Sequence, residues 1–363
     1  MYKIVNGLLL FPYSLSLKFR NLLYDKNIFK SFSYDIPVIS VGNITVGGTG
    51  KTPHVEFLIR LLESKYRIAV ISRGYKRKSK GFREVSIEDN YRDTGDEPLQ
   101  IKRKFPHITV VVDGSRSRAI EKLMGRPEDQ RPQLILLDDA FQHRKVRPQL
   151  SILLIDYNRP ITKDYLLPLG RLRDLPSSKN RADIVIVTKA PETIDSIEMR
   201  DWRTRLKLKD NQHLFFSMID YDEIRPVFDE GDMRYAYSGK AVLFSGIAND
   251  KPLKDFLARI KKSIVAEKKY GDHHNYSKHN IRQLDKLARK NPTAALITTE
   301  KDSQRLFRHT AITPELKKRL FYIPICPQII IDTSSFLEIT KEEIDRYGKR
   351  AILEVVEEMI NIH

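Results

Sequence analysis

The 363-residue sequence predicts an α/β fold, in which a mainly parallel sheet covered by helices on both faces is followed by a second, smaller α/β domain. Through the first half of the chain, short apolar segments that suit buried strands alternate with segments whose apolar residues recur at helical spacing. After about residue 190 the sequence becomes polar, and strand-like and helical segments then alternate again. We expect the boundary near residues 216–235, and we assign residues 1–220 to the first domain and residues 221–363 to the second.

The individual elements follow from this alternation. Residues 55–62 carry apolar side chains at helical spacing, and residues 118–124 form a second helical stretch. The polar segment 76–98 interrupts the pattern, and we expect a hairpin around residues 82–87 with a loop beyond it. The strand candidates are residues 38–41, 68–72, 109–112, 134–137, 152–155, 184–187, 214–218, 241–244, 294–298 and 320–325.

The charge balance narrows the class of partner. The chain has 64 Lys and Arg against 47 Asp and Glu, and its formal net charge of +17 favours nucleotides, nucleic acids or an acidic membrane surface. The basic residues are spread along the chain without a recognisable nucleic-acid motif, so we expect no nucleic acid and no obligate protein partner. The only cysteine, Cys326, excludes an intramolecular disulfide and favours a reducing, cytosolic compartment.

The N-terminal segment is apolar but does not read as a signal peptide. Residues 7–13 follow a single lysine, lack a small-residue cleavage site and are interrupted by Pro12. No apolar run approaches the roughly 20 residues that span a bilayer. Residues 14–28 combine Leu15 and Phe19 with basic residues, a pattern that fits either a helix packed on its own domain or one that lies in a membrane interface; periodicity alone favours the first.

Residues 38–53 form a strand, a glycine-dense turn and a helix start, the order that phosphate binding requires. Lys51 can reach the β- and γ-phosphates of a nucleotide, and the Thr52 hydroxyl can ligate Mg²⁺. The strict phosphate-loop pattern has glycine where Thr45 stands, so we expect the first turn of the loop to differ. The first domain is therefore predicted to be a P-loop NTPase-like α/β/α sandwich that binds ATP, rather than to carry a glycine-rich turn that binds nothing. The nucleotide-binding candidates are Gly47, Gly48, Thr49, Gly50, Lys51 and Thr52.

Two adjacent carboxylates, Asp138 and Asp139, follow the apolar segment 134–137. This Walker B arrangement places an acid at the carboxyl edge of a sheet, near the phosphates. Because adjacent residues of a strand point in opposite directions, we expect only one of the two to reach Mg²⁺ or its water shell. The alternative is that both acids only cap the end of the strand.

Several blocks of the sequence resemble the tetraacyldisaccharide 4'-kinase family. The resemblance begins with residues 42–53 and continues through the heptapeptide Asp-Asp-Ala-Phe-Gln-His-Arg at residues 138–144. The family has glycine where Ala140 stands and glutamate where Asp174 stands, and the shorter Asp174 side chain would change the distance of its carboxylate to Mg²⁺. Further matching blocks are residues 72–75, 95–98, 167–174, 272–274 and 299–302, so the resemblance spans both halves of the chain.

The resemblance implies a kinase that uses ATP and Mg²⁺ to phosphorylate the 4'-hydroxyl of a tetraacyldisaccharide 1-phosphate lipid. The product would be lipid IVA, an intermediate of lipid A and lipopolysaccharide synthesis, made by a peripheral enzyme at the cytoplasmic face of the inner membrane of a Gram-negative bacterium. The alternative is another P-loop NTPase that acts on a small molecule or in metal-cofactor insertion. Thr188-Lys189 weakly resembles a guanine-recognition motif, but the aspartate expected two residues after Lys189 is missing.

The resemblance also assigns roles to residues whose function the sequence pattern alone does not determine. Asp96 becomes the base that receives the hydroxyl proton, although Asp96 before Pro98 otherwise reads as a helix cap, and we place it in a loop. His273 becomes its partner, where the pattern alone allows a surface histidine or a metal ligand. Residues 300–302 are expected to line the cleft, by contacting nucleotide or by anchoring a loop. The predicted catalytic residues are Asp96, His273 and Lys51, the metal candidates Thr52, Asp138, Asp139 and Asp174, and the headgroup contacts Arg73, Tyr75, Arg116 and Arg171.

Overall fold

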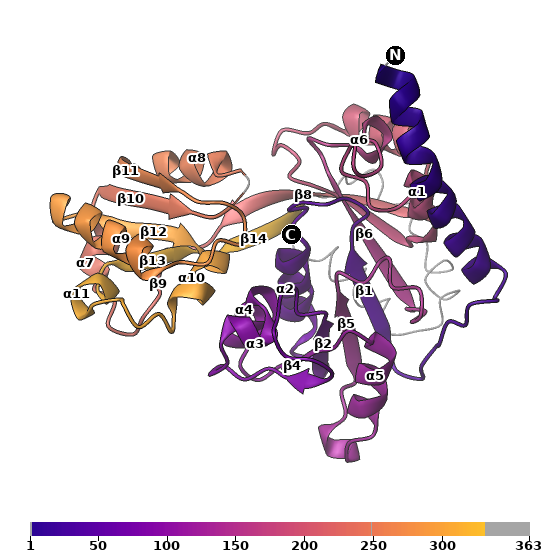
Figure 1. The fold of residues 1–363 in the computed structure, drawn as a ribbon, viewed down its shortest axis with the longest axis horizontal. Helices are drawn as coiled ribbons and strands as arrows, with labels where there is room; N and C mark the ends of the chain where they lie inside the picture. Colours follow the sequence, from indigo (N-terminus) through magenta and orange to yellow (C-terminus); the bar gives the residue numbers. More distant parts are fainter. Residues whose placement is uncertain (1, 248, 331–363) are drawn as a thin grey trace.

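The computed structural model describes residues 2–247 and 249–330, and the side chains of the described residues from residue 12 onward. Figure 1 shows two lobes, each built on one sheet, that are connected by the long strand β8 (His213–Tyr221) and by β14 (Ile325–Ile330). The predicted division at residues 220 and 221 stays a prediction, and residues 331–363 of the expected second domain lie outside the described residues. Strand β14 belongs by number to the predicted second domain, but it pairs antiparallel with β8 and so extends the sheet of the first lobe.

The first lobe contains a nine-stranded sheet in the order β14-β8-β7-β6-β1-β5-β2-β4-β3. Strands β3 and β14 are antiparallel to their neighbours, and the strands between them are parallel. The strand bounds are β1 Val38–Gly42, β2 Ile68–Ser72, β3 Arg83–Glu84, β4 Thr109–Val112, β5 Leu134–Asp138, β6 Leu150–Asp156 and β7 Ile184–Thr188.

Helices cover both faces of this sheet because its strands are apolar on both sides. On one face α2 and α4 pack against residues such as Val41 and Val70, and on the other α1, α5 and α6 pack against residues such as Val38 and Val185. The α/β/α arrangement predicted for the first lobe is therefore present. The helix bounds are α1 Tyr2–Asp25, α2 Lys51–Leu62, α3 Tyr91–Thr94, α4 Asp96–Lys104, α5 Arg116–Met124 and α6 Ser196–Leu206.

The second lobe contains a five-stranded sheet in the order β11-β10-β12-β13-β9, parallel except for β9 at one edge. Helices α9, α10 and α11 pack on one face, and α7 and α8 pack on the other. The strand bounds are β9 Arg225–Pro226, β10 Lys240–Ser245, β11 Ser263–Lys269, β12 Ala295–Thr299 and β13 Leu320–Ile323. The helix bounds are α7 Met233–Tyr237, α8 Lys251–Arg259, α9 Lys278–Lys290, α10 Glu300–Leu306 and α11 Pro314–Lys317.

The segment 76–98 differs from the expected hairpin and loop. Strand β3 has two residues and pairs with β4, and the remainder of the segment contains α3 and the start of α4. Pro98 lies in the first turn of α4, where a missing backbone N–H removes no helical hydrogen bond. Strand β11 was not predicted, because its alternation of polar and half-buried residues is weak in apolar content.

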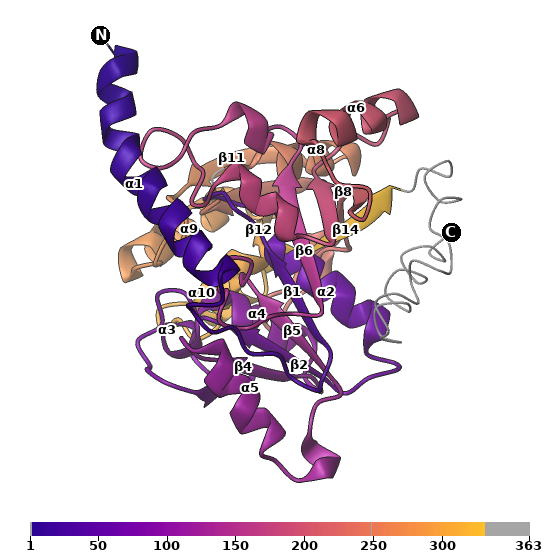
Figure 2. The same ribbon diagram turned by 90° about the vertical axis from the view of Figure 1, so that its right-hand side faces the viewer.

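Helix α1 lies along the first lobe, and its N-terminal end extends beyond it (Figure 2). Its second half is anchored, since the Tyr13 hydroxyl donates to the Arg173 carbonyl at 3.1 Å and Arg20 donates to the Gln142 carbonyl at 2.6 Å. Phe19 nevertheless remains 60% exposed, and Leu15 and Leu22 are also exposed. Among the described residues, no helix combines the length and the apolar content that crossing a bilayer needs.

Candidate functional site

The glycine-dense turn connects the carboxyl end of β1 to the start of α2, where Lys51 is the first helical residue. Gly47 and Gly50 have φ angles of 110° and 84°, a backbone region that favours glycine. The buried Asn43 side chain donates to the Thr49 hydroxyl at 2.7 Å and so braces the turn from within. The second part of the loop is therefore held by contacts among its own residues.

The first part of the loop is held by a second segment. Thr45 forms an isolated antiparallel bridge with Leu172, and the Val46 amide donates to the Arg171 carbonyl at 2.8 Å. A residue with a side chain is compatible with this strand-like contact, which accounts for threonine in place of the glycine of the strict pattern.

The acidic pair lies beside this loop because β1 and β5 are parallel neighbours, with Val41 paired to Asp138. The Asp139 carboxylate lies 3.8 Å from the Lys51 ammonium and accepts from the Arg173 guanidinium. Burial opposes ionisation of Asp139, but Lys51 and Arg173 together hold its pKa below the ordinary value. The structure thus brings Lys51 and Asp139 together, and Arg173 is an additional cation at this site.

Asp138 has the features of a metal ligand. Its side chain is 1% exposed, its Oδ2 atom accepts from the Ser72 hydroxyl at 3.1 Å, and its Oδ1 atom has no hydrogen-bond partner. Burial raises the pKa of Asp138 to about 7, and the carboxylates of Glu97 and Asp139 act in the same direction. A divalent cation at the unpartnered oxygen would relieve both the missing contact and the excess negative charge.

The other predicted ligands divide into two groups. Thr52 is buried in the first turn of α2, directly after Lys51. Asp174 is also buried, but its carboxylate accepts from Arg181 at 3.3 Å and from Asn21 of α1 at 3.4 Å, so its contacts lie with α1 and residues 176–181. In the part of the chain that the structure describes, no group of three or more His, Cys, Asp or Glu side chains could hold a metal by itself. Mg²⁺ is usually bound by one or two carboxylates together with substrate phosphates, so this donor set fits it.

Asp96 is the first residue of α4 and not, as expected from the sequence, part of a loop. The turn into this helix needs Gly95, whose φ is 94° and whose added Cβ atom would lie 3.1 Å from Gly74. The Asp96 carboxylate is buried, and its Oδ2 atom lies 3.2 Å from Nδ1 of His273, a residue of the second lobe. The structure therefore brings together the two predicted residues, from positions 177 residues apart.

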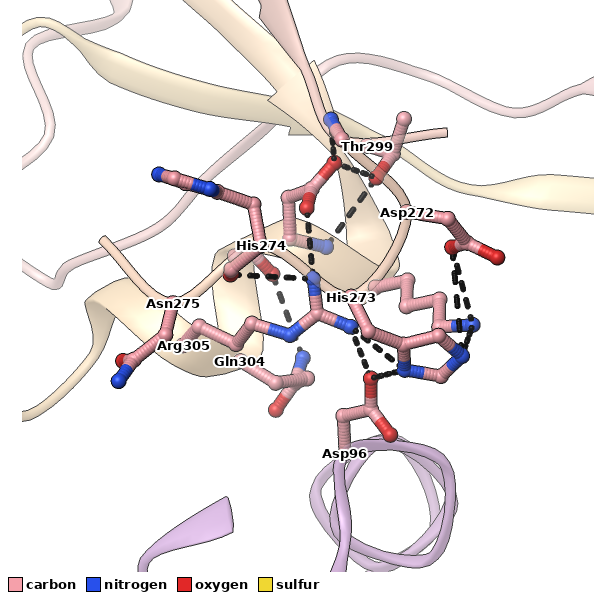
Figure 3. A network of polar contacts seen from close by, with 12 residues as sticks. Asp96, Asp272, His273, His274, Asn275, Thr299, Gln304 and Arg305 are labelled. Carbon is pink, nitrogen blue, oxygen red and sulfur yellow. Dashed lines mark hydrogen bonds and ion pairs between the residues drawn. The ribbon is translucent and has the colours of Figure 1, made fainter. Parts of the chain in front are cut away.

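Arg305 joins this pair from α10, as Figure 3 shows, and it was not predicted. Its guanidinium donates to the Asp96 carboxylate and, at 3.1 Å, to Asp302. Asp302 in turn accepts from the Thr299 hydroxyl at 2.8 Å, which fixes the start of α10. The only sequence signal for Arg305 is its place one helical turn after Asp302, which is a weak signal because such pairs are common on helices.

The charges around Asp96 favour its ionised form. Burial acts to raise the pKa of Asp96, but the hydrogen bond with His273 and the charges of Lys301 and Arg305 together hold it far below the ordinary value. Glu97, the next residue, pairs with Lys301 at 3.3 Å and also raises the pKa of Asp138. The Asp96 cluster and the Asp138 cluster are therefore electrostatic neighbours.

The four predicted headgroup contacts have different surroundings. Arg73 and Arg171 are exposed, and the exposed Tyr75 has its ring 5.3 Å from the His273 ring. Arg116 is only 2% exposed, and its guanidinium donates to the carbonyl oxygens of Asp113 and Asp138. In this structure Arg116 therefore supports the backbone beneath the acidic pair instead of presenting its charge to solvent.

The parallel sheet, the glycine-rich turn and the Lys51-Thr52 pair at the start of α2 define a P-loop protein of the α/β/α class, with a second α/β lobe against it. A family model described as "Tetraacyldisaccharide-1-P 4'-kinase" matches residues 7–345. The chain belongs to this family, so the resemblance of its motifs and the expected enzyme class are confirmed. The alternative of another P-loop NTPase is not favoured, and the Lys189 ammonium is paired with Asp156 at 2.5 Å.

Similar proteins agree with this assignment along most of the chain. A tetraacyldisaccharide 4'-kinase from Porphyromonas gingivalis is 46% identical over 328 residues, which cover 88% of this chain and 91% of that protein. Proteins of the same name from Parabacteroides distasonis and Flavobacterium johnsoniae are each 41% identical, covering 92% and 93% of this chain and 93% and 98% of their own. The crystal structure of LpxK from Aquifex aeolicus in complex with ATP superposes with a TM-score of 0.73 at 27% identity, covering 96% of this chain and all of that one.

Proposed function

We propose that this chain transfers the γ-phosphate of ATP to the 4'-hydroxyl of a tetraacyldisaccharide 1-phosphate and so forms lipid IVA in lipid A biosynthesis. The names of its relatives and the ATP complex of a similar structure support this activity. The structural observation that carries the proposal is the contact of Asp96 with His273 across the two lobes, beside the carboxylates that face the phosphate loop. Phosphoryl transfer needs such a group opposite the bound phosphates to receive the hydroxyl proton.

The phosphate loop and its neighbours would hold the nucleotide. Backbone N–H groups of residues 47–52 would bind the phosphates, and Lys51, the first residue of α2, would reach the terminal ones. The Thr52 hydroxyl and Asp138, or Asp139 in its place, would hold Mg²⁺. When bound, Mg²⁺ neutralises charge that develops on the transferring phosphate.

Asp96 would receive the proton of the attacking hydroxyl. Its Oδ2 atom is engaged by Arg305 and His273, whereas its Oδ1 atom accepts only from the Glu97 amide at 3.2 Å among the described contacts. A carboxylate held in its ionised form is a weak base. A weak base suffices here, because the transition state of phosphoryl transfer is loose and the hydroxyl keeps its proton until late.

The acceptor lipid would bind through exposed side chains. Arg73, Tyr75 and Arg171 would contact its headgroup, and the exposed apolar residues of α1 would lie in the membrane interface. The enzyme would then act as a peripheral protein at the cytoplasmic face of the inner membrane of a Gram-negative bacterium. Asp174 remains a metal candidate only if its contact with Arg181 opens.

A nucleotide-preference assay tests this function. Purified protein is incubated with the acylated disaccharide 1-phosphate and with Mg-ATP or Mg-GTP, and phosphorylated lipid is measured together with nucleotide hydrolysis. We expect ATP to support phosphorylation, and we expect conversion of ATP to ADP to depend on the lipid, because the γ-phosphate passes to the lipid hydroxyl and not to water. Hydrolysis of GTP that does not depend on the lipid would contradict the proposal.

A further inference from the structure

Lys301, the second residue of α10, lies against the imidazole ring of His273 on the side away from Asp96. Its ammonium is 3.1 Å from Nε2 of His273 and 3.3 Å from the Glu97 carboxylate, and 3.9 Å from the Asp272 carboxylate. Figure 3 shows the Asp96 carboxylate beside the His273 ring, and the Lys301 ammonium contacts the other ring nitrogen. Each ring nitrogen of His273 therefore faces a different charged group.

The chemistry of these neighbours fixes what each can exchange with the ring. Burial opposes the charge of Lys301, but Glu97, Asp96 and Asp272 raise its pKa above the ordinary value, so it is a charged donor at neutral pH. An ammonium has no acceptor site, so the His273 Nε2 atom that it contacts must be unprotonated. On the other side, an ionised carboxylate only accepts hydrogen bonds, so Nδ1 of His273 must carry the proton.

The opposite tautomer leaves two unfavourable contacts. A proton on Nε2 would face the Lys301 ammonium at 3.1 Å, and an unprotonated Nδ1 would face the Asp96 carboxylate at 3.2 Å. Its gains would be a proton nearer the Asp272 carboxylate, whose Oδ1 atom is 4.0 Å from Nε2 and beyond hydrogen-bond distance, and an acceptor for Arg305, which lies 3.2 Å from Nδ1. That proximity has a simpler cause, because Arg305 and His273 both donate to the same Asp96 oxygen and so lie close together.

We propose that Lys301 is a positioning residue that holds His273 in the tautomer with the proton on Nδ1, so that this proton is donated to Asp96. The proposal gives residues 299–302 a function, since Thr299 and Asp302 fix the start of the helix on which Lys301 lies. It rests on the proposed role of Asp96 and His273 in phosphoryl transfer. In that role the fixed tautomer keeps the imidazole ring and the carboxylate aligned toward the acceptor hydroxyl.

The tautomer can be measured by NMR without any activity assay. An imidazole nitrogen without a proton resonates well downfield of one that carries a proton, so a protein labelled with ¹⁵N-histidine reports both ring nitrogens, with His273→Gln assigning the signals. In the wild-type protein at neutral pH we expect Nε2 of His273 to be the unprotonated nitrogen. A wild-type His273 protonated at Nε2 and not at Nδ1 would overturn the proposal without recourse to any variant.

A pair of variants tests the part played by Lys301. Lys301→Met keeps the length of the side chain and removes the donor. We expect mixed tautomers and a kcat roughly 10-fold lower, a smaller loss than the roughly 100-fold or more that an acid–base group itself contributes, with KM for ATP little changed. Lys301→Arg restores a donor and is expected to recover the wild-type tautomer and most of kcat. An unchanged tautomer in folded Lys301→Met would overturn the proposal. A changed tautomer with unchanged kcat would support the positioning and contradict the proposed role of Asp96 and His273.

Discussion

The Arg305 guanidinium on α10 of the second lobe donates to the carboxylate of Asp96 at the start of α4 in the first lobe. Both side chains are almost fully buried, so this ion pair joins the two lobes in a place that is shielded from water. Buried ion pairs are strongly destabilising to break on one side, because the remaining charge is left without compensation. The position of the second lobe and the ionisation of Asp96 are therefore linked.

The first prediction concerns the charge of Asp96. Because the pKa of Asp96 is lowered in the folded protein, its charge stabilises the fold fully above the ordinary aspartate pKa of about 3.9. This contribution decreases below that pH and is lost as pH falls through the lower pKa of the folded state. Asp96→Asn should abolish turnover, and the free energy of unfolding of the wild type should exceed that of Asp96→Asn by more at pH 7 than at pH 3. Urea unfolding at both pH values measures the difference, with Asp201→Asn, at an exposed site on α6, as the control. A gap that does not shrink in acid would show that the Asp96 charge does not stabilise the fold.

The second prediction concerns the metal. Asp138 has a buried, unpartnered oxygen, so Asp138→Asn should raise the Mg²⁺ concentration needed for half-maximal activity by 10-fold or more, as expected when a metal contact is lost. Removal of Mg²⁺ with EDTA should abolish phosphorylation, and added Mg²⁺ should restore it. The measurement is a Mg²⁺ titration of initial rates for wild type, Asp138→Asn and Asp174→Asn. If only Asp174→Asn changes the Mg²⁺ dependence, the metal site lies elsewhere than inferred.

The third prediction concerns a second buried contact between the lobes. The Lys104 ammonium bridges Glu56 of α2 at 2.6 Å and Glu300 of α10 at 2.9 Å, and all three side chains are nearly inaccessible. Lys104→Met would leave two buried carboxylates unpaired, so we expect a loss of about 3–5 kcal/mol in the free energy of unfolding. Lys286→Met, at an exposed helical site, should change it by less than about 0.5 kcal/mol. Equal stability of the two variants would mean that the bridge is replaced by water.

The fourth prediction separates the anchored face of α1 from its exposed face. Removing the whole helix would also break the contacts of Tyr13 and Arg20 with the first lobe, so substitutions of exposed residues are the cleaner test. Phe19→Ser combined with Leu22→Ser should weaken binding to vesicles that contain anionic phosphatidylglycerol, because less apolar area enters the interface. Tyr237→Ser, an exposed aromatic in the second lobe, serves as the control. Unchanged sedimentation with vesicles would count against docking through α1.

The parts of the site that could be predicted are those with local chemistry. The glycine-rich turn before Lys51 and the acids after an apolar strand are each recognisable within about a dozen residues. In each case the strand and the functional residues that follow it are contiguous in the sequence. The two buried carboxylates of Glu56 and Glu300 carry no such signal. Their common partner, Lys104, meets them through packing of helices whose residues are far apart in sequence, and a single sequence does not encode that pairing in any pattern.

Other parts were accessible only through resemblance or were missed. Asp96 and His273 lie 177 residues apart and have no shared spacing, so only the family motifs paired them. The helix that begins at Asp96 was expected to be a loop, because residues 76–98 are polar and Pro98 masks a helix start. Arg305 was missed for another reason. In a chain rich in Lys and Arg, a single arginine is expected to be a surface cation, and only the fold shows that this one is buried.

The most direct test of the central claim is mass spectrometry of the lipid after purified protein has acted on the acylated disaccharide 1-phosphate with Mg-ATP. We expect the lipid to gain one phosphoryl group, located by fragmentation on the 4' oxygen of the distal sugar, and we expect no gain with Lys51→Ala protein. A lipid recovered without added mass, or phosphorylated at any other hydroxyl, would contradict the function assigned to this chain.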